Sequence, residues 1–184
     1  MTAFADPPIT AKAEATRSHL LGLATELFVR RGYAAVTLDD IAGAAELTKG
    51  AIYGHFRSKG QLLVEVIRRL QGQLDDNIRF GDDYQLFLRP ESADLRLLLV
   101  DAASAARHDP DVAAGIEEIY SARNRWLLDN LAHAYHDPDT VLFIISALSN
   151  GIGVEEAFAR PTPSTDVFRR TLHTMLDAVV KKPA

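Results

Sequence analysis

The sequence contains no cysteine among its 184 residues, only one tryptophan and only two methionines. Without thiols, both disulfide bonds and thiolate metal sites are excluded. No apolar run approaches the roughly 18 residues of a membrane-spanning helix. The first fifteen residues also lack the charged-then-apolar pattern of a signal peptide. These absences predict a cytoplasmic protein with no membrane partner.

Common catalytic signatures are missing as well. The sequence has no Gly-x-Ser-x-Gly, no phosphate-binding loop and no His-Glu-x-x-His, so we expect neither an enzyme nor a cofactor. His133 and His136, with Asp137 and Asp139 nearby, could bind a metal. A solvated histidine pair at a helix end is the commoner arrangement, and the sequence predicts no metal site.

Charge is unevenly distributed along the chain. Residues 1–70 carry nine Lys and Arg against seven Asp and Glu, a net charge of +2, whereas residues 71–184 carry eleven against eighteen, a net charge of −7. A cationic end on an anionic body would orient a molecule toward a phosphate surface. A random distribution of charged residues explains a net charge of +2 equally well.

The apolar residues recur at helical spacing and nowhere alternate over a strand-length stretch, so we predict an all-α fold of about nine helices. The sequence divides into a disordered arm over 1–10, a helix-turn-helix domain over 11–57 and a helical body over 58–184. Helices are expected at about 11–31, 37–44, 48–54, from 58 past 74, 92–107, 111–135, 140–158 and 165–180, with a break over 78–90.

Two short helices joined by a tight turn are indicated between residues 37 and 54. Thr37 is a helix N-cap candidate, with Asp40 at the capping-box position, and Thr48 is the next N-cap. Ser58 then opens a long helix, with Gln61 three residues later. Short helices across such a turn are typical of a helix-turn-helix.

In a helix-turn-helix the second helix enters the major groove by its N-terminal residues. These residues would be Thr48, Lys49, Gly50 and Ala51, which offer one long cation, one hydroxyl and two small side chains. Phosphate oxygens could accept hydrogen bonds from Tyr53, His55 and Lys59. Ile52 and Phe56 are apolar and four residues apart, so they should be core.

The segment VTLDDIAGAAELTKGAIYGHFRSKGQLL at 36–63 resembles the DNA-binding head of the TetR family of transcriptional regulators. Its Thr-Leu-Asp-Asp-Ile-Ala run, Leu-Thr-Lys-Gly start, Tyr-x-His-Phe ending and Ser-Lys helix start occur in order at fixed spacing. With the first helix, the resemblance covers about 15–65.

The resemblance implies a repressor that binds double-stranded DNA at a palindromic operator. It places Thr37, Tyr53, His55 and Lys59 on phosphates, and Thr48, Lys49, Gly50 and Ala51 in the groove. Two positions depart from the family pattern: Gly54 stands where many relatives have a larger residue, and Gly60 where an acidic residue is common.

Members of the family are homodimers whose last two helices form a four-helix bundle with the partner. Two apolar stripes fit that arrangement, although a monomer core would explain them equally well. The candidate interface residues are Phe143, Ala147, Gly151, Val154, Phe168, Leu172, Met175, Leu176 and Val179.

The resemblance also implies a small-molecule effector enclosed by the middle helices. A mostly apolar set with a few polar groups fits a ligand pocket, and ordinary core packing is the competing interpretation for each member. The candidates are Phe80, Tyr84, Phe87, Leu97, Leu98, Asp101, Tyr120, Asn124, Trp126, Phe143 and Asn150.

Three alternatives stay open from the sequence: a DNA-binding regulator without a ligand, an activator, and a helical interaction module. A closed cavity in the body would favour a sensor, and a solid core would favour a regulator or module without a ligand. The sequence does not identify the effector, the operator or the regulated genes.

Overall fold

The structure is a computed structural model that describes residues 11–75, 92–133 and 135–179. The predicted arm over 1–10 and the predicted break over 78–90 lie outside these residues. Within them the fold is all-α, as predicted, with eight helices and no strand: α1 Ala11–Arg31, α2 Leu38–Ala44, α3 Lys49–Tyr53, α4 Lys59–Asp75, α5 Ala93–Ala105, α6 Pro110–Leu131, α7 Pro138–Ala157 and α8 Thr165–Val179.

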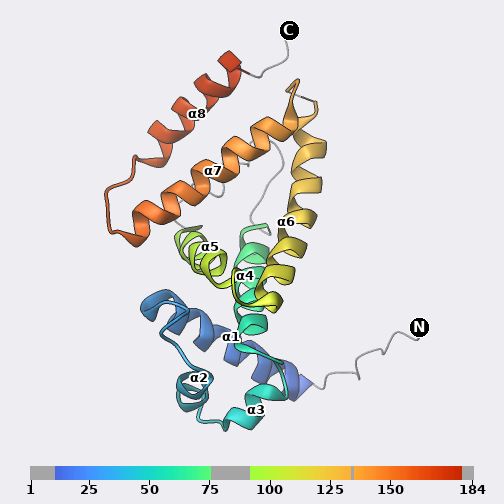
Figure 1. Cartoon of the computed structure of the whole chain (residues 1–184), viewed down its shortest axis with the longest axis vertical. Coiled ribbons are helices and arrows are strands. Elements are labelled where there is room, and N and C mark those ends of the chain that lie inside the picture. The colour runs from blue at the N-terminus through green and yellow to red at the C-terminus, as the bar shows by residue number, and fades with distance from the viewer. Residues whose placement is uncertain (1–10, 76–91, 134, 180–184) are drawn as a thin grey trace, which may run out of the picture.

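Figure 1 shows α1, α2 and α3 grouped at one end of the molecule, which we call the head. The helices α4, α5 and α6 form its middle, and α7 and α8 lie side by side at the far end. The long helix α4 runs from the head into the middle layer, so it connects the two ends (Figure 1).

Capping chemistry sets several helix boundaries. Thr37 caps α2 in a complete capping box with Asp40, as predicted. The chain breaks between α6 and α7, near the predicted gap between helices at 135 and 140, but the break ends at Asp137, which caps α7, and Pro138 occupies the first turn of that helix. Proline suits that position because its missing N–H has no helical partner there. Helix α7 therefore starts at Pro138, two residues before the predicted start at residue 140.

One hydrophobic core joins the head to the middle layer. Its buried side chains come from α1 through α6 and include Phe28, Ile41, Ile52, Leu98 and Val112. Leu98, a candidate pocket residue, is 1% exposed within this core. Because head and middle layer share one core, a shift of α4, α5 or α6 must repack contacts with the head.

A second core fills the far end of the molecule. Leu127 and Leu131 of α6 meet Val141 and Ile145 of α7 there, and α8 contributes two more residues. Those two, Leu172 and Leu176, are only 2% and 1% exposed. Their assignment to a dimer face is therefore wrong, because α8 uses its apolar stripe to pack against its own chain. Phe168 also packs on this core.

Another apolar stripe along α7 faces solvent. Phe143 is 73% exposed and Val154 39%, and Ala147 and Gly151, which lie between them at helical spacing, are exposed too. Met175 of α8 is 48% exposed. The side chain of Val179 lies outside the described residues. Exposed apolar surface of this extent is typical of an interaction site.

The same helix is more apolar than the sequence pattern suggested. By length and composition α7 could cross a bilayer, with a mean hydropathy of 1.2 over an 18-residue window of which 28% is buried. A single helix of this kind is weak evidence for a membrane span, since the core helix of a soluble protein passes the same test.

Two glycines allow α4 and α6 to approach closely. A Cβ at Gly60 would overlap the Asp109 carboxylate, and a Cβ at Gly115 would overlap the Val64 side chain. Gly60 is buried. The departure from the family pattern at Gly60 therefore has a packing reason, because the N-terminus of α4 lies against the N-terminus of α6.

Candidate nucleic-acid interface and body cavity

The short helix α3 presents its N-terminal end to solvent. Thr48 caps it, accepting a hydrogen bond from the Ala51 N–H at 3.2 Å, and Thr48, Lys49 and Gly50 are all exposed. Ile52, on the opposite face, is fully buried. The predicted groove-facing residues thus form one open surface, and Ala51 is the least exposed of them.

Lys49 is paired within the head. Its Nζ donates to Asp39 Oδ2 of α2 at 2.8 Å, and both side chains are largely solvent-accessible. The hydrogen bond and the negative charge of Asp39 raise the pKa of Lys49 above its usual value. Because the pair is exposed, it holds Lys49 weakly and can exchange with a phosphate or a base edge.

Tyr53 and His55 lie at the C-terminal end of α3, where the predicted DNA interface stops. Tyr53 is 51% exposed, which leaves its hydroxyl available to a phosphate. Gly54 is the C-cap of α3 in right-handed helical geometry, so the helix ends one residue before the predicted boundary. Phe56, predicted to be core, is 1% exposed.

Lys59 differs from its predicted role. Its Nζ donates to the Val36 carbonyl at 2.6 Å and lies 4.1 Å from the centroid of the Tyr33 ring. Burial lowers the pKa of Lys59, and the charges of Asp101 and Asp40 partly offset that effect. The ammonium therefore stabilises the loop between α1 and α2, and its assignment to a phosphate does not hold in this structure.

The Thr37 hydroxyl is engaged in capping. It accepts from the Asp40 N–H at 3.1 Å and donates to Asp40 Oδ2 at 2.6 Å. The Thr37 hydroxyl and the Thr37 N–H, which both donate to the Asp40 carboxylate, lower the pKa of Asp40 to about 2. Thr37 remains exposed, so a phosphate contact at this position would compete with the cap.

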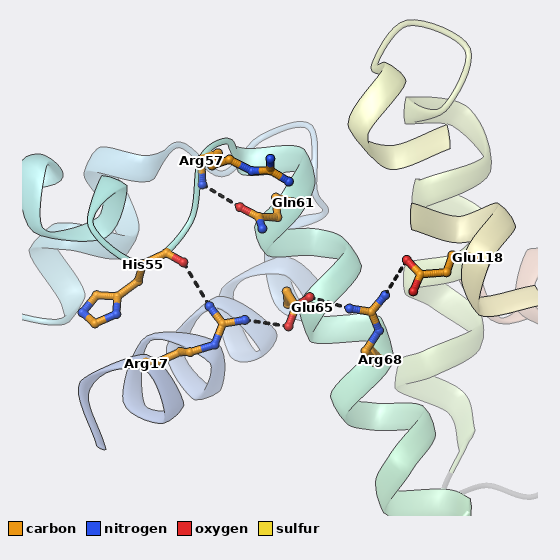
Figure 2. A network of polar contacts seen from close by, with 7 residues as sticks. All are labelled: Arg17, His55, Arg57, Gln61, Glu65, Arg68 and Glu118. Atoms are coloured by element: carbon orange, nitrogen blue, oxygen red, sulfur yellow. Dashed lines mark hydrogen bonds and ion pairs between the residues drawn. The ribbon is translucent and has the colours of Figure 1, made fainter. Parts of the chain in front are cut away.

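A chain of polar contacts runs from the end of α3 to α6 (Figure 2). Arg17 of α1 donates to the His55 carbonyl at 3.0 Å and to Glu65 of α4 at 2.6 Å. Glu65 also accepts from Arg68 at 2.6 Å, and Arg68 reaches Glu118 of α6 at 3.1 Å. The Arg17 guanidinium lies 4.4 Å from the centroid of the Phe56 ring.

Tyr33 forms a second connection between head and body. Its N–H donates to Asp101 Oδ2 at 2.7 Å, and its phenol lies near the Asp109 carboxylate. Burial and the charge of Asp109 together raise the pKa of Tyr33 to about 12. Gly32 precedes it with φ of 79°, a conformation that glycine adopts without strain. Asp101, a pocket candidate, thus serves this connection.

A small cavity lies between the body helices. Its volume is about 10 Å³, which is room for about one water molecule. Tyr120 and Asn150, both predicted pocket residues, line it together with Leu99, Arg123, Leu127, Ile145, Ser146 and Ser149. Asn124 lies beside this site along the chain, and its buried Oδ1 has no hydrogen-bond partner within the described residues.

The remaining pocket candidates lie elsewhere. The side chain of Phe143 is 73% exposed. Its prediction as a residue of an enclosed pocket is therefore wrong. Its prediction as a residue of the interface stays, because it lies in the exposed apolar stripe of α7. Leu97 of α5 is half-buried and does not line the cavity. Phe80, Tyr84, Phe87 and the side chain of Trp126 lie outside the described residues.

Sequence reasoning missed Arg17, Glu65 and Arg123. Arg17 and Glu65 are 48 residues apart, and no local pattern pairs them. Arg123 sits on α6 in the run Ser-Ala-Arg-Asn-Arg, where it reads as an ordinary surface cation. The described residues contain no group of three or more His, Asp or Glu side chains that could hold a metal ion.

Known proteins resemble this chain in the sequence of its head and in its overall fold. Residues 20–66 match the model of the bacterial regulatory proteins of the tetR family. The regulator AcrR of Shigella flexneri is 44% identical over 55 residues, which is 30% of this chain and 26% of AcrR. The repressor DhaR of a Mycobacterium strain is 39% identical over 66 residues, 34% of this chain and 33% of DhaR.

These matches span about a quarter to a third of each curated relative. Beyond the head the likeness is structural. A transcriptional regulator from Saccharomonospora viridis, solved in complex with choline, superposes with a TM-score of 0.67 at 20% identity, over 92% of this chain and 100% of that chain. The head of this chain thus matches the tetR family model, and the whole chain shares the all-α fold of that regulator.

Proposed function

We propose that this protein is a DNA-binding transcriptional regulator that acts as a homodimer on a palindromic operator. The observation that carries the proposal is the exposed N-terminal end of α3, where Thr48, Lys49 and Gly50 stand free of the core in the segment that matches the family model. Proteins of several genera that match this segment are transcriptional regulators or repressors by name.

A homodimer accounts for the exposed apolar stripe on α7. Phe143 and Val154 would be buried against the same stripe of a second copy, with Met175 of α8 at its edge. Such a two-fold arrangement sets two α3 helices about one DNA turn, roughly 34 Å, apart on opposite half-sites. The stripe is then an interface of a cytoplasmic protein, and α7 need not meet a lipid bilayer.

We further propose that a small-molecule effector releases the protein from DNA. The body cavity touches α6 and α7. Helix α6 contacts α4 through Arg68–Glu118, and Asp109 at its N-terminus lies beside Tyr33, which follows α1 of the head. An effector that binds the two conformations with different affinity would shift the population away from the DNA-binding one. The choline complex of the Saccharomonospora regulator gives a precedent for ligand binding in this fold.

The test is selection of bound duplexes from a random DNA library with the full chain. We expect recovered sites to be inverted repeats whose half-site centres lie about 10 base pairs, or a multiple, apart. Recovered DNA without a shared sequence would contradict the regulator assignment. Genome-wide recovery of the bound sites would then show whether they overlap promoters, as a repressor requires, or lie upstream of them, as for an activator.

A further inference from the structure

The turn that follows α3 is held by a side chain from another helix, Arg17 of α1 (Figure 2). We propose that Arg17 is a positioning residue for DNA recognition, which fixes the direction of α3 and links it to Glu65 of α4. This inference rests on the proposed function, because it concerns the same DNA-binding helix. It adds a residue that acts on base recognition without touching DNA.

Helix α3 is too short to keep its own direction. It has only five residues, Lys49–Tyr53, far fewer than the roughly 12 that an isolated helix needs to be even marginally stable in water. The Lys49–Asp39 pair at its exposed end restrains it weakly. The direction of Lys49 therefore depends on the buried Ile52 and on the contacts that hold the C-terminal end of the helix.

Arg17 makes three contacts at that end. Its Nη1 donates to the His55 carbonyl at 3.0 Å, and its Nη2 donates to Glu65 Oε2 at 2.6 Å. Its guanidinium carbon also lies 4.4 Å from the centroid of the Phe56 ring. The His55 carbonyl lies past the last turn of α3 and has no partner inside that helix. Arg17 therefore supplies the hydrogen bond that the short helix cannot.

The link from Arg17 to α4 is partly buried and held from two sides. The side chains of Arg17 and Glu65 are both partly buried, so salt and water screen their attraction less than at an exposed pair. The other oxygen of Glu65 accepts from Arg68 at 2.6 Å, which fixes the carboxylate on α4. Because α4 continues into the body, Arg17 ties the direction of α3 to the position of α4.

Ordinary packing of α1 on α4 is the competing interpretation. Arg69 of α4 offers an internal comparison, since its Nη1 donates to the Ser18 carbonyl of α1 at 2.9 Å. That bond joins the same two helices but involves no residue of α3 or of the turn after it. Packing alone predicts similar effects when either arginine is lost, whereas positioning predicts an effect on DNA recognition from Arg17 only.

The first test compares affinity for a selected operator with affinity for a random duplex, using the full-length protein well below its melting temperature. Arg17→Ala should weaken operator binding by about tenfold, the loss expected when one base contact is misplaced, with a much smaller loss on random DNA. Arg69→Ala removes the same charge and is the matched control, which should bind both duplexes like the wild type. Equal losses for the two variants, or equal losses on the two duplexes, overturn the proposal.

Two further variants keep the test decisive if Arg17→Ala does not fold. Arg17→Lys keeps the charge but not the planar fork, so it cannot hold both the His55 carbonyl and Glu65. Glu65→Gln keeps a hydrogen-bond acceptor but removes the charge that holds Arg17. Both should weaken operator binding in the same direction as Arg17→Ala and by a smaller factor. Wild-type operator affinity in both folded variants overturns the positioning role.

Amide hydrogen exchange reports on the end of α3 without any DNA. The N–H groups of His55 and Phe56 donate to the Ile52 carbonyl. Their exchange should accelerate by about tenfold or more in Arg17→Ala, because a hydrogen bond to a charged group is lost beside them. Arg69→Ala should leave it unchanged. Exchange that stays at the wild-type rate in Arg17→Ala overturns the proposal.

The outcomes distinguish this inference from the proposed function. A protein that selects an operator and keeps full affinity without Arg17 overturns the positioning role and leaves the DNA-binding assignment standing. A wild type that selects no DNA sequence overturns the proposed function, and the role of Arg17 in DNA recognition with it.

Discussion

The head and the far end of this molecule expose opposite kinds of surface. The head places a short helix with Thr48, Lys49 and Gly50 toward solvent, whereas the far end exposes an apolar stripe through Phe143 and Val154. Hydrated polar residues suit a charged partner, and an apolar stripe suits a second protein surface. This contrast fits the proposed function, in which DNA binds at one end and a second copy of the chain at the other.

The largest expected effect comes from charging the apolar stripe. Phe143→Asp should convert the homodimer to a monomer and abolish operator binding, since a single head reads only one half-site. Sedimentation and operator titration measure the two results. The control is Ala103→Asp, which adds the same charge at an exposed position of α5. A dimeric, DNA-binding Phe143→Asp variant would show that the stripe is not the interface.

At the head, Lys49→Ala should weaken operator binding by about tenfold to a hundredfold, the range expected when one base-edge contact is lost. If Lys49 meets a phosphate instead, affinity should fall on all sequences alike, and the salt dependence should decrease by about one unit of slope. Titrations at several salt concentrations distinguish the two. Lys12→Ala, on an exposed residue of α1, is the control and should change affinity little.

Between head and body, Gly60→Ala should destabilise the protein by about 1–3 kcal/mol because its Cβ would overlap Asp109. Gly22→Ala is the matched control, since nothing lies within 4 Å of a Cβ at that exposed position of α1. It should be neutral or stabilising by up to about 1 kcal/mol. Urea unfolding measures both, and equal effects would argue against close packing of α4 on α6.

The Arg17–Glu65 contact can be measured by a double-mutant cycle. Both side chains are partly buried, at 26% and 20% exposure, so we expect a coupling free energy of about 0.5–1.5 kcal/mol from unfolding of the two alanine variants and the double variant. The exposed pair Arg30–Glu26 on the same helix should give about 0.5 kcal/mol or less. A coupling no larger than that of the exposed pair would mean that the network in Figure 2 adds no stability.

Alkaline pH tests the second connection, through Tyr33. Its folded-state pKa is raised to about 12 from an ordinary value of 10.0. The stability it contributes is thus fully present below pH 10 and lost as the pH rises toward 12. Denaturant unfolding from pH 9 to 11.5 should show a steeper loss for the wild type than for Tyr33→Phe. Parallel curves would show that neither burial nor Asp109 raises the pKa of Tyr33 in the folded protein.

The helices were largely predictable because their signals are local. Thr37 and Asp40, three residues apart, form the capping box that starts α2. The apolar spacing predicted a helix over 11–31, which are the bounds of α1 in the structure. The start of α7 was missed because a proline can either break a helix or begin one, and only the Asp137 cap decides between them. Lys59 was misplaced because its inward partner, the Val36 carbonyl, is 23 residues away.

The sequence by itself determined the helical fold, the identity of the head and the residues at the open end of α3, because these depend on caps, periodicity and a motif at fixed spacing. Only the tertiary structure decided which apolar stripe stays exposed and which packs inside. It also joined Arg17 to Glu65, placed Arg123 at a cavity and gave Gly60 its packing role. Each of these contacts joins residues that lie far apart in the sequence and on different helices, so no local sequence pattern predicts it.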